Sequence, residues 1–207
     1  MDSLFKGAVR FRERSFANNK ELFQKLGQEQ KPHTLFIGCS DSRVVPELIT
    51  KAMPGELFVV RNIANIVPRY RVAKEYVATT AAIEYAIVAL NVENIVVCGH
   101  SNCGGCNALY STPEQMMDLP NVEHWLEQLA PVRQQVDENY PNASPEEREW
   151  ITEQVNIVAQ LDNLMSYPLI RDRFKDGKLK LYGWYYVIDK GEVYNFNIET
   201  REFELIG

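Results

Sequence analysis

The stretch that most constrains the fold is Ile95–Cys106, which reads IVVCGHSNCGGC. Its first three residues are β-branched, and so short an apolar run predicts a strand buried on both faces of a parallel sheet. The strand ends near Gly99, and His100 and Cys103 follow, with two glycines that let the backbone approach a ligand closely. His-x-x-Cys is a spacing of metal ligands, so a metal site is expected at this strand end.

A second apolar run, TLFIGC, ends at Cys39 and is followed by a charged pair, Asp41 and Arg43. Ligands of open α/β sheets bind beyond the carboxyl ends of strands, where the strand order reverses. If the two strands are neighbours, Cys39 joins His100 and Cys103 in a set of three ligands with an open fourth position. That arrangement is typical of catalytic zinc sites, and the charged pair then lies within reach of the open position.

These motifs resemble the β-class carbonic anhydrases. The CSDSR run at Cys39 and the HSNCGG run at His100 have the family's order and spacing, and so do PGE at 54–56, RNIAN at 61–65, AIEYA at 82–86 and GWY at 183–185. The resemblance covers most of the chain. It implies one Zn²⁺ per chain on Cys39, His100 and Cys103, reversible hydration of carbon dioxide to bicarbonate and a proton, and a homodimer or homotetramer.

The resemblance also implies roles for residues around the metal. The metal lowers the pKa of its water, Asp41 held by Arg43 accepts a hydrogen bond from that water, and the backbone N–H of Gly104 helps to place a substrate oxygen. No residue identifies itself as a proton shuttle.

Three further positions favour the plant-type subgroup of the family. Gln30, Phe58 and Tyr85 match a glutamine, a phenylalanine and a tyrosine that surround the substrate pocket there. The bicarbonate-inhibited bacterial subgroup has a tryptophan three residues before its first cysteine, where this chain has Phe36, whereas Gly38 matches that bacterial subgroup.

Two other functions remain open from the sequence. A hydrolase of carbonyl sulfide or carbon disulfide could use the same metal chemistry, because fold and ligands do not fix the substrate. The other alternative is a non-catalytic zinc-stabilised or thiol-redox protein, because Cys103 and Cys106 form a C-x-x-C motif, which is typical of thiol–disulfide exchange. That redox hypothesis gives Cys39, His100 and the charged pair no role, whereas the zinc hypothesis leaves only Cys106 without one.

Composition favours a small-molecule substrate. The net charge is −6, the pI is about 5.2, and lysine and arginine are scattered, which argues against nucleic acid or an anionic membrane as partner. We expect a cytoplasmic protein, because the chain shows no secretory signal or membrane-spanning run. Four cysteines in that compartment indicate metal binding or catalysis before disulfides.

The periodicity predicts an α/β fold, with a mainly parallel central sheet flanked by helices, an N-terminal helical arm and a C-terminal hairpin. We expect a single domain over residues 1–207. Residues 1–30 form the arm, with two helices over Ser3–Leu26 that break near Asn18 and pack on the core or on a neighbouring subunit. The hairpin is expected over Lys178–Ile188 and Glu192–Ile198.

Two longer helices are also predicted. The first spans Val72–Leu90 and is apolar almost all round, so we expect the sheet to cover one side and a second subunit the other. The second begins at Ser144-Pro145, with a cap and a first-turn proline. Its apolar face is expected to comprise Ile151, Val155, Val158, Leu161 and Met165.

Overall fold

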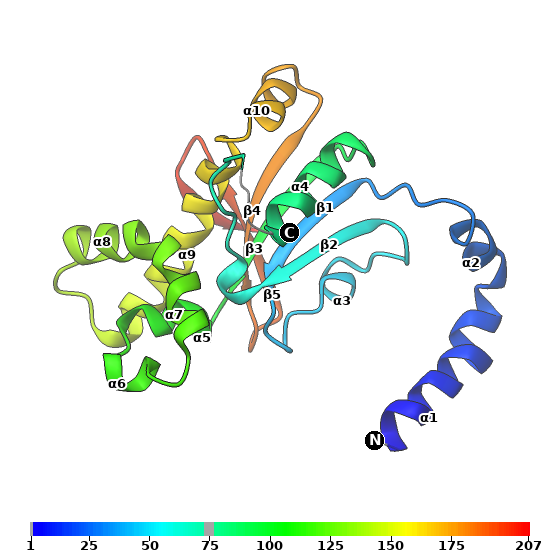
Figure 1. Cartoon of the computed structure of the whole chain (residues 1–207), viewed down its shortest axis with the longest axis horizontal. Coiled ribbons are helices and arrows are strands. Elements are labelled where there is room, and N and C mark those ends of the chain that lie inside the picture. Colours follow the sequence, from blue (N-terminus) through cyan, green and yellow to red (C-terminus); the bar gives the residue numbers. More distant parts are fainter. Residues whose placement is uncertain (1, 73–76) are drawn as a thin grey trace. The chain divides into compact units, whose positions relative to one another are not determined.

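The structure is a computed structural model that describes residues 2–72 and 77–207 (Figure 1). The chain divides into two compact units, of which one ends at Lys31 and the other spans Pro32–Gly207. The second unit contains the whole sheet and the metal ligands. The prediction of a single domain with an arm at 1–30 stays a prediction.

The N-terminal unit is helical, as expected. It consists of α1 (Asp2–Arg10), a π-helical stretch η1 (Phe11–Phe16) and α2 (Lys20–Leu26). The break falls before Lys20, where the sequence predicts it, and Gly27 caps α2. The ring of Phe23 lies 5.6 Å from that of Phe11 and 5.4 Å from that of Phe16.

Among the described residues, six strands form one sheet in the order β2-β1-β3-β4-β5-β6. The first four strands in this order are parallel, and β5 and β6 continue antiparallel. This confirms the mainly parallel sheet and the hairpin, whereas β6 was not predicted. The strands are β1 (Thr34–Cys39), β2 (Leu57–Asn62), β3 (Asn94–His100), β4 (Lys180–Val187), β5 (Glu192–Asn197) and β6 (Glu202–Leu205).

The strand order reverses at β1. The chain runs from β1 to β2 on one side and later returns to β3 on the other, with Gly38 of β1 in register with Cys98 of β3. Cys39 and His100 therefore end two neighbouring parallel strands. This confirms the condition on which the predicted ligand set depends.

Helices flank the sheet, and several begin at a proline, whose fixed φ suits a first turn (Figure 1). Ser144 caps α9 as predicted, and it also forms a complete capping box with Glu147. The helical segments are α3 (Pro46–Thr50), η2 (Ile63–Asn65), α4 (Ala78–Val88), α5 (Gly104–Asn107), η3 (Ala108–Tyr110), α6 (Pro113–Met116), α7 (Pro120–Leu126), η4 (Glu127–Leu129), α8 (Ala130–Asn139), α9 (Pro145–Leu164) and α10 (Pro168–Lys175).

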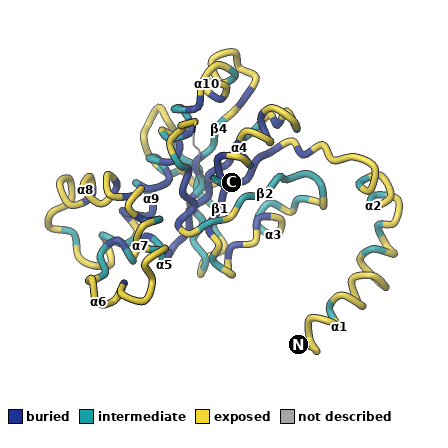
Figure 2. Tube along the Cα trace, viewed as in Figure 1, coloured by how far each residue is buried: buried dark blue, intermediate teal, exposed yellow. Residues whose placement is uncertain are grey.

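The core lies along β1 and β3, which are buried on both faces as expected (Figure 2). On one face the apolar side chains pack with those of α4 and α9, and a smaller cluster around Phe36 covers the other face. Helix α9 sits tightly against β3 and β4, since a Cβ on Gly99 or Gly183 would lie 2.7 or 2.9 Å from atoms of Ile157. Only glycine permits this approach.

The predicted helix over Val72–Leu90 is too long. Helix α4 begins at Ala78, because the backbone of Val77 is not helical, with φ −116° and ψ 80°. Val72 lies outside the helix, and residues 73–76 lie outside the described residues. The sheet side of α4 is buried, whereas Tyr85 and Val88 on its other side are 50% and 67% exposed. The interface expected to cover that side stays a prediction.

The predicted buried face of α9 is partly wrong. Ile151 and Leu161 are buried, but Val155, Val158 and Met165 are only half-buried. The buried positions instead include Thr152, Glu153, Asn156 and Gln160, whose side chains make hydrogen bonds inside the protein. Ile157 is also buried and packs in the apolar core.

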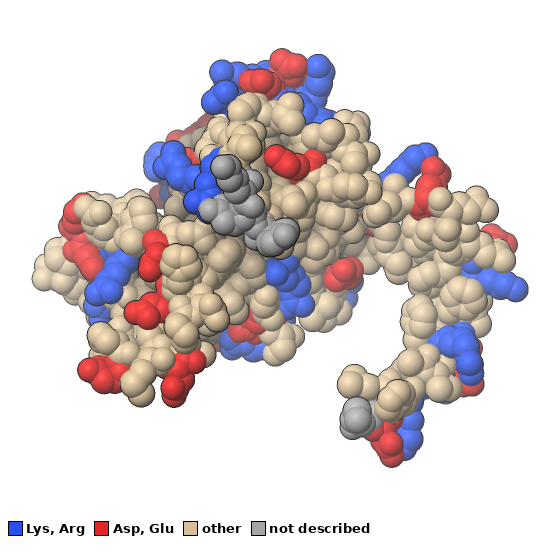
Figure 3. Space-filling view, in the orientation of Figure 1, with Lys and Arg blue, Asp and Glu red and all other residues tan. Residues whose placement is uncertain are grey.

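Acidic and basic side chains are interspersed on the face of the molecule shown in Figure 3. Within the described ranges, no helix combines the length and apolar character needed to cross a membrane.

Candidate metal centre

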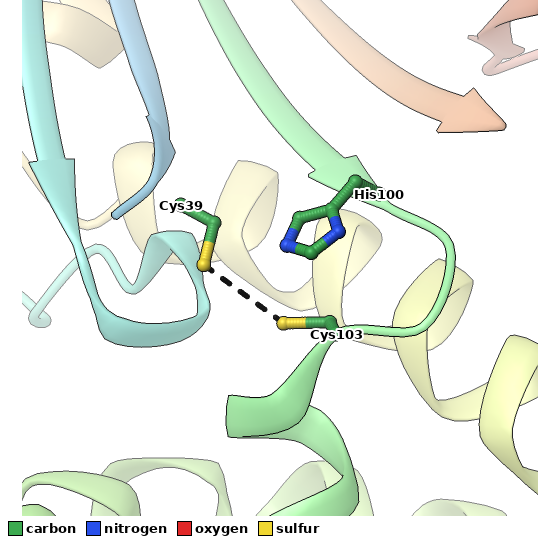
Figure 4. Close-up of side chains that lie close together, drawn as sticks. All are labelled: Cys39, His100 and Cys103. Atoms are coloured by element: carbon green, nitrogen blue, oxygen red, sulfur yellow. Dashed lines mark hydrogen bonds between the residues drawn. The ribbon is translucent and has the colours of Figure 1, made fainter. Parts of the chain in front are cut away.

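Three predicted ligands converge beyond the ends of β1 and β3 (Figure 4). Cys39 ends β1, His100 ends β3, and Cys103 immediately precedes α5. One ligand atom from each lies within 4.8 Å of the others, and the two sulfur atoms are 4.0 Å apart. All three side chains are buried.

The imidazole of His100 is oriented for metal binding. Its Nδ1 lies 3.0 Å from the carbonyl oxygen of Ser101, which can only accept, so Nδ1 carries the proton. The lone pair of Nε2 then faces the two sulfur atoms. Nε2 is buried and has no hydrogen-bond partner among the described residues, which is costly unless a cation occupies the space beside it.

The donor set and its spacing fit zinc. Two sulfur ligands about 2.3 Å from a tetrahedral zinc ion lie roughly 3.8 Å apart, close to the 4.0 Å found between Cys39 and Cys103. Without a cation both thiols hold their protons: the pKa of Cys39 is raised to about 12, first by its contact with Cys103, and that of Cys103 to about 12, first by Cys106. A bound metal has to displace these protons.

Asp41 and Arg43 form the predicted pair next to this group. Arg43 Nε donates to Asp41 Oδ1 at 2.9 Å and Arg43 Nη2 donates to Oδ2 at 2.7 Å, a bidentate arrangement. The Arg43 guanidinium holds the pKa of Asp41 well below its usual range, so the carboxylate is ionised. Oδ2 lies 4.0 Å from Nε2 of His100, at the open side of the ligand set.

Comparison with known proteins identifies the family. A family model described as carbonic anhydrase matches residues 34–193. A carbonic anhydrase of Helicobacter pylori strain J99 is 42% identical over 206 residues, which cover 98% of this chain and 93% of the relative. The structure of the β-carbonic anhydrase CcaA matches with a TM-score of 0.95 at 41% identity, covering 100% of this chain and 99% of that one.

The chain belongs to the β-carbonic anhydrase family. One of two β-carbonic anhydrases from Sordaria macrospora, described as tetrameric, also matches, with a TM-score of 0.80 at 33% identity over 95% of this chain and 96% of that one. The family expectation drawn from the CSDSR and HSNCGG motifs is therefore confirmed.

In this β-carbonic anhydrase, two further residues hold the metal centre, and sequence reasoning assigned neither of them a role. Arg61 of β2 donates from Nε to the carbonyl oxygen of Cys39 at 2.9 Å and from Nη2 to that of Asp41 at 2.5 Å. It fixes the backbone between a ligand and the carboxylate. The RNIAN motif at 61–65 was the only signal for this residue.

Glu153 of α9 is the second such residue. Its carboxyl group is buried and accepts from the backbone N–H of Cys103 at Oε1 and from the hydroxyl of Tyr185 at Oε2, both at 2.7 Å. Burial raises the pKa of Glu153 to about 7. The sequence contains one sign that Glu153 lies on an inward side of the helix: the polar residues Glu153, Asn156 and Gln160 recur at helical spacing around the apolar Ile157.

The two glycines after Cys103 differ in the space around their Cα atoms. A Cβ on Gly105 would lie 2.9 Å from the Cβ of Ala64, so α5 can approach η2 only with glycine there. Ala64 itself has a left-handed φ of 60°. A Cβ on Gly104 would meet nothing within 4 Å, so its backbone faces open space at the start of α5.

The predicted substrate residues Phe58 and Tyr85 contact each other, with ring centroids 5.9 Å apart. Phe58 is in register with Leu35, four residues before Cys39 on β1, so it lies roughly 13 Å along the strand from that ligand. Gln30 belongs to the N-terminal unit. The substrate role of these three residues stays a prediction.

The other two cysteines are buried and free, like the ligands. Cys98 lies within β3, and burial raises its pKa to about 12. Cys106 packs in an apolar cluster, and its sulfur lies 3.6 Å from the donating Nδ2 of Asn156.

Proposed function

We propose that this protein catalyses the reversible hydration of carbon dioxide to bicarbonate and a proton. Cys39, His100 and Cys103 would hold one Zn²⁺ per chain. The observation that carries the proposal is the buried, unpartnered Nε2 of His100 facing two thiols beside an ionised carboxylate, in a chain of the β-carbonic anhydrase family.

When bound, zinc lowers the pKa of a water molecule and so supplies a nucleophile near neutral pH. The protein orients that nucleophile. Asp41 is ionised and held on two sides by Arg43, so its Oδ2 can accept a hydrogen bond at the open side of the ligand set. One proton of the attacking water is thereby fixed and a lone pair is directed at the carbon atom of the substrate.

The start of α5 supports the choice of Gly104 as a substrate-binding residue. The first backbone N–H groups of a helix have no partner within it, and the missing side chain leaves the N–H of Gly104 accessible. It can donate to an oxygen of carbon dioxide or bicarbonate, whose charge develops during the reaction.

We further propose a homodimer or homotetramer, in which Gln30, Phe58 and Tyr85 line the substrate pocket. The exposed side of α4 supports this, since Tyr85 and Val88 would otherwise leave apolar surface in water. Sedimentation velocity should give at least a dimer at micromolar concentration. Val88→Asp should weaken that assembly, and Lys190→Asp in the exposed β4–β5 turn serves as a control; a stable wild-type monomer would contradict this assembly.

We also propose that the protein is located in the cytoplasm. The four buried cysteines are all free, as in proteins of reducing compartments.

The experiment that tests the function combines metal analysis with a stopped-flow assay. We expect one zinc per chain and rapid hydration of carbon dioxide by the same preparation. Purified protein that contains zinc but hydrolyses carbonyl sulfide or carbon disulfide faster than it hydrates carbon dioxide would replace the proposed substrate. Protein without zinc and with a reducible Cys103–Cys106 bond would replace the whole proposal by a redox function.

A further inference from the structure

A cavity of about 530 Å³ lies away from the metal centre, between α8 and α9 on one side and β4 to β6 on the other. None of its lining residues is a metal ligand or a member of the Asp41–Arg43 pair. Its volume falls in the range of about 300 to 1,000 Å³ typical of small-molecule sites. The proposed hydration reaction does not use it.

One wall of the cavity is aromatic. Tyr185, Phe196 and Phe203 line it, with the ring centroid of Phe203 at 6.2 Å from that of Tyr185 and 5.3 Å from that of Phe196. The rings are inclined to one another by 66° and 49°, so the wall presents both faces and edges. Such a wall fits a single planar ring, which aromatic side chains contact in stacked or edge-to-face geometry.

The polar lining includes one arginine. Arg201 has a left-handed φ of 59° in the turn before β6, where its backbone N–H donates to the carbonyl oxygen of Asn197 at 2.8 Å. Its guanidinium makes no hydrogen bond or ion pair with any residue that the structure describes. Arg201 is exposed and lines the cavity, so its guanidinium donors face solvent there and are accessible to a ligand.

We propose that this cavity binds a small aromatic monocarboxylate. The carboxylate would form a bidentate pair with Arg201, and the ring would contact Tyr185 and Phe203. Gln135 and Gln154, which also line the cavity, supply amide groups for a polar ring substituent. Glu202 is a further lining residue, and its negative charge repels a dianion such as phosphate more strongly than a monocarboxylate.

The cavity is connected to the metal centre by a short chain of hydrogen bonds. The ring of Tyr185 lines the cavity, its hydroxyl donates to Glu153, and the same carboxyl group holds the backbone N–H of Cys103, each at 2.7 Å. A ligand that fixes the Tyr185 ring therefore also restrains the turn at Cys103. This link rests on the proposed zinc site, whereas binding of the carboxylate does not.

Binding is tested by titrating the zinc-containing protein with benzoate in a calorimeter. Benzamide, which has the same shape without the charge, and cyclohexanecarboxylate, which lacks the aromatic ring, are the control ligands. We expect benzoate to bind best and Arg201→Ala to weaken it about tenfold, because a charge-assisted bidentate pair is lost. Arg171→Ala, at an exposed arginine on α10, should bind as the wild type does.

Equal affinity of wild type and Arg201→Ala for benzoate, or no binding at millimolar benzoate, would overturn the cavity site. The link is tested by the rate of zinc transfer to a chelator, which saturating benzoate should slow about fivefold in the wild type. In Tyr185→Phe benzoate should leave that rate unchanged, and an equal slowing in both proteins would overturn the link. Protein that binds benzoate but holds no zinc would also overturn the link, and would leave the cavity site standing.

Discussion

The two sides of the metal centre are held in different ways. On the side of β3 and α9, His100 and Cys103 are buried, and Glu153, with 1% of its surface exposed, fixes the backbone of Cys103. On the side of β1, Asp41 and Arg43 form an ion pair whose side chains are 18% and 46% exposed. Buried hydrogen bonds of charged groups are costly to break, whereas a solvent-exposed ion pair stabilises a fold little.

This difference separates two tasks. The ligands must keep one geometry in order to retain a metal ion, and the buried side provides that rigidity. In the proposed mechanism the carboxylate of Asp41 exchanges hydrogen-bond partners during the reaction, and an exposed ion pair permits that exchange. The comparison therefore predicts that changes on the buried side affect metal retention, and that changes to the ion pair affect activity at constant metal content.

The largest effect is expected for Cys39→Ala. Removing one of three ligands should reduce zinc content to background and abolish hydration, as measured by metal analysis and stopped flow. Cys98→Ala is the matched control, since this thiol is also buried and free but is not a member of the ligand set. A Cys39→Ala protein with one tightly bound zinc and normal activity would remove Cys39 from the ligands.

Arg43→Ala should show the opposite pattern. It keeps zinc but loses activity by about 100-fold, because Asp41 is no longer held in its productive orientation. The freed carboxylate, 4.0 Å from His100 Nε2, should turn onto the metal in a crystal structure of the variant. Arg171→Ala provides the control at another exposed arginine. Full activity together with an Asp41 that stays off the metal would exclude the proposed role of the pair.

The ligand set was predictable from local patterns. Cys39 and His100 each follow a short apolar run and a glycine, and the side chains at the carboxyl ends of neighbouring parallel strands meet at one edge of the sheet. The contact between Asp41 and Arg43 was also predictable from a local pattern, because a separation of two residues in a turn is enough for the two side chains to meet.

The contacts of Glu153 were not predictable in this way. Its partners lie 50 and 32 residues away in sequence, so they depend on where α9 packs across the sheet. Apolar periodicity also misjudged α9, since buried Asn156 and Gln160 count as polar although their amides are hydrogen-bonded inside. Helix α10 and strand β6 were missed because each is short and mostly exposed.

Substitutions at Glu153 test the buried side of the metal centre, and their expected effects are of intermediate size. Glu153→Ala should accelerate zinc transfer to a chelator by about 10- to 100-fold, because the N–H of Cys103 loses its buried acceptor. Glu153→Gln keeps an oxygen for that N–H and should change the rate only a few-fold. Glu146→Ala, at an exposed position of the same helix, is the control. Equal zinc transfer rates in all four proteins would show that Glu153 does not position the ligand.

The smallest effect is expected at Cys106, which is buried near the ligands but lies outside the set of three. Its sulfur packs in an apolar cluster, where it contacts the thiol of Cys103 and accepts a long contact from Asn156. Because Cys106 is not one of the three ligands, Cys106→Ala should keep one zinc and hydrate carbon dioxide within about twofold of the wild type. The variant should lose roughly 1 kcal/mol of unfolding free energy, measured in urea, for the small cavity that it creates.

In the zinc-containing wild type the thiolate of Cys103 is engaged by the metal, so mass spectrometry after mild peroxide treatment should find no Cys103–Cys106 disulfide. A disulfide that forms readily in that protein, or a loss of zinc in Cys106→Ala, would mean that Cys106 shares in the chemistry of the buried side.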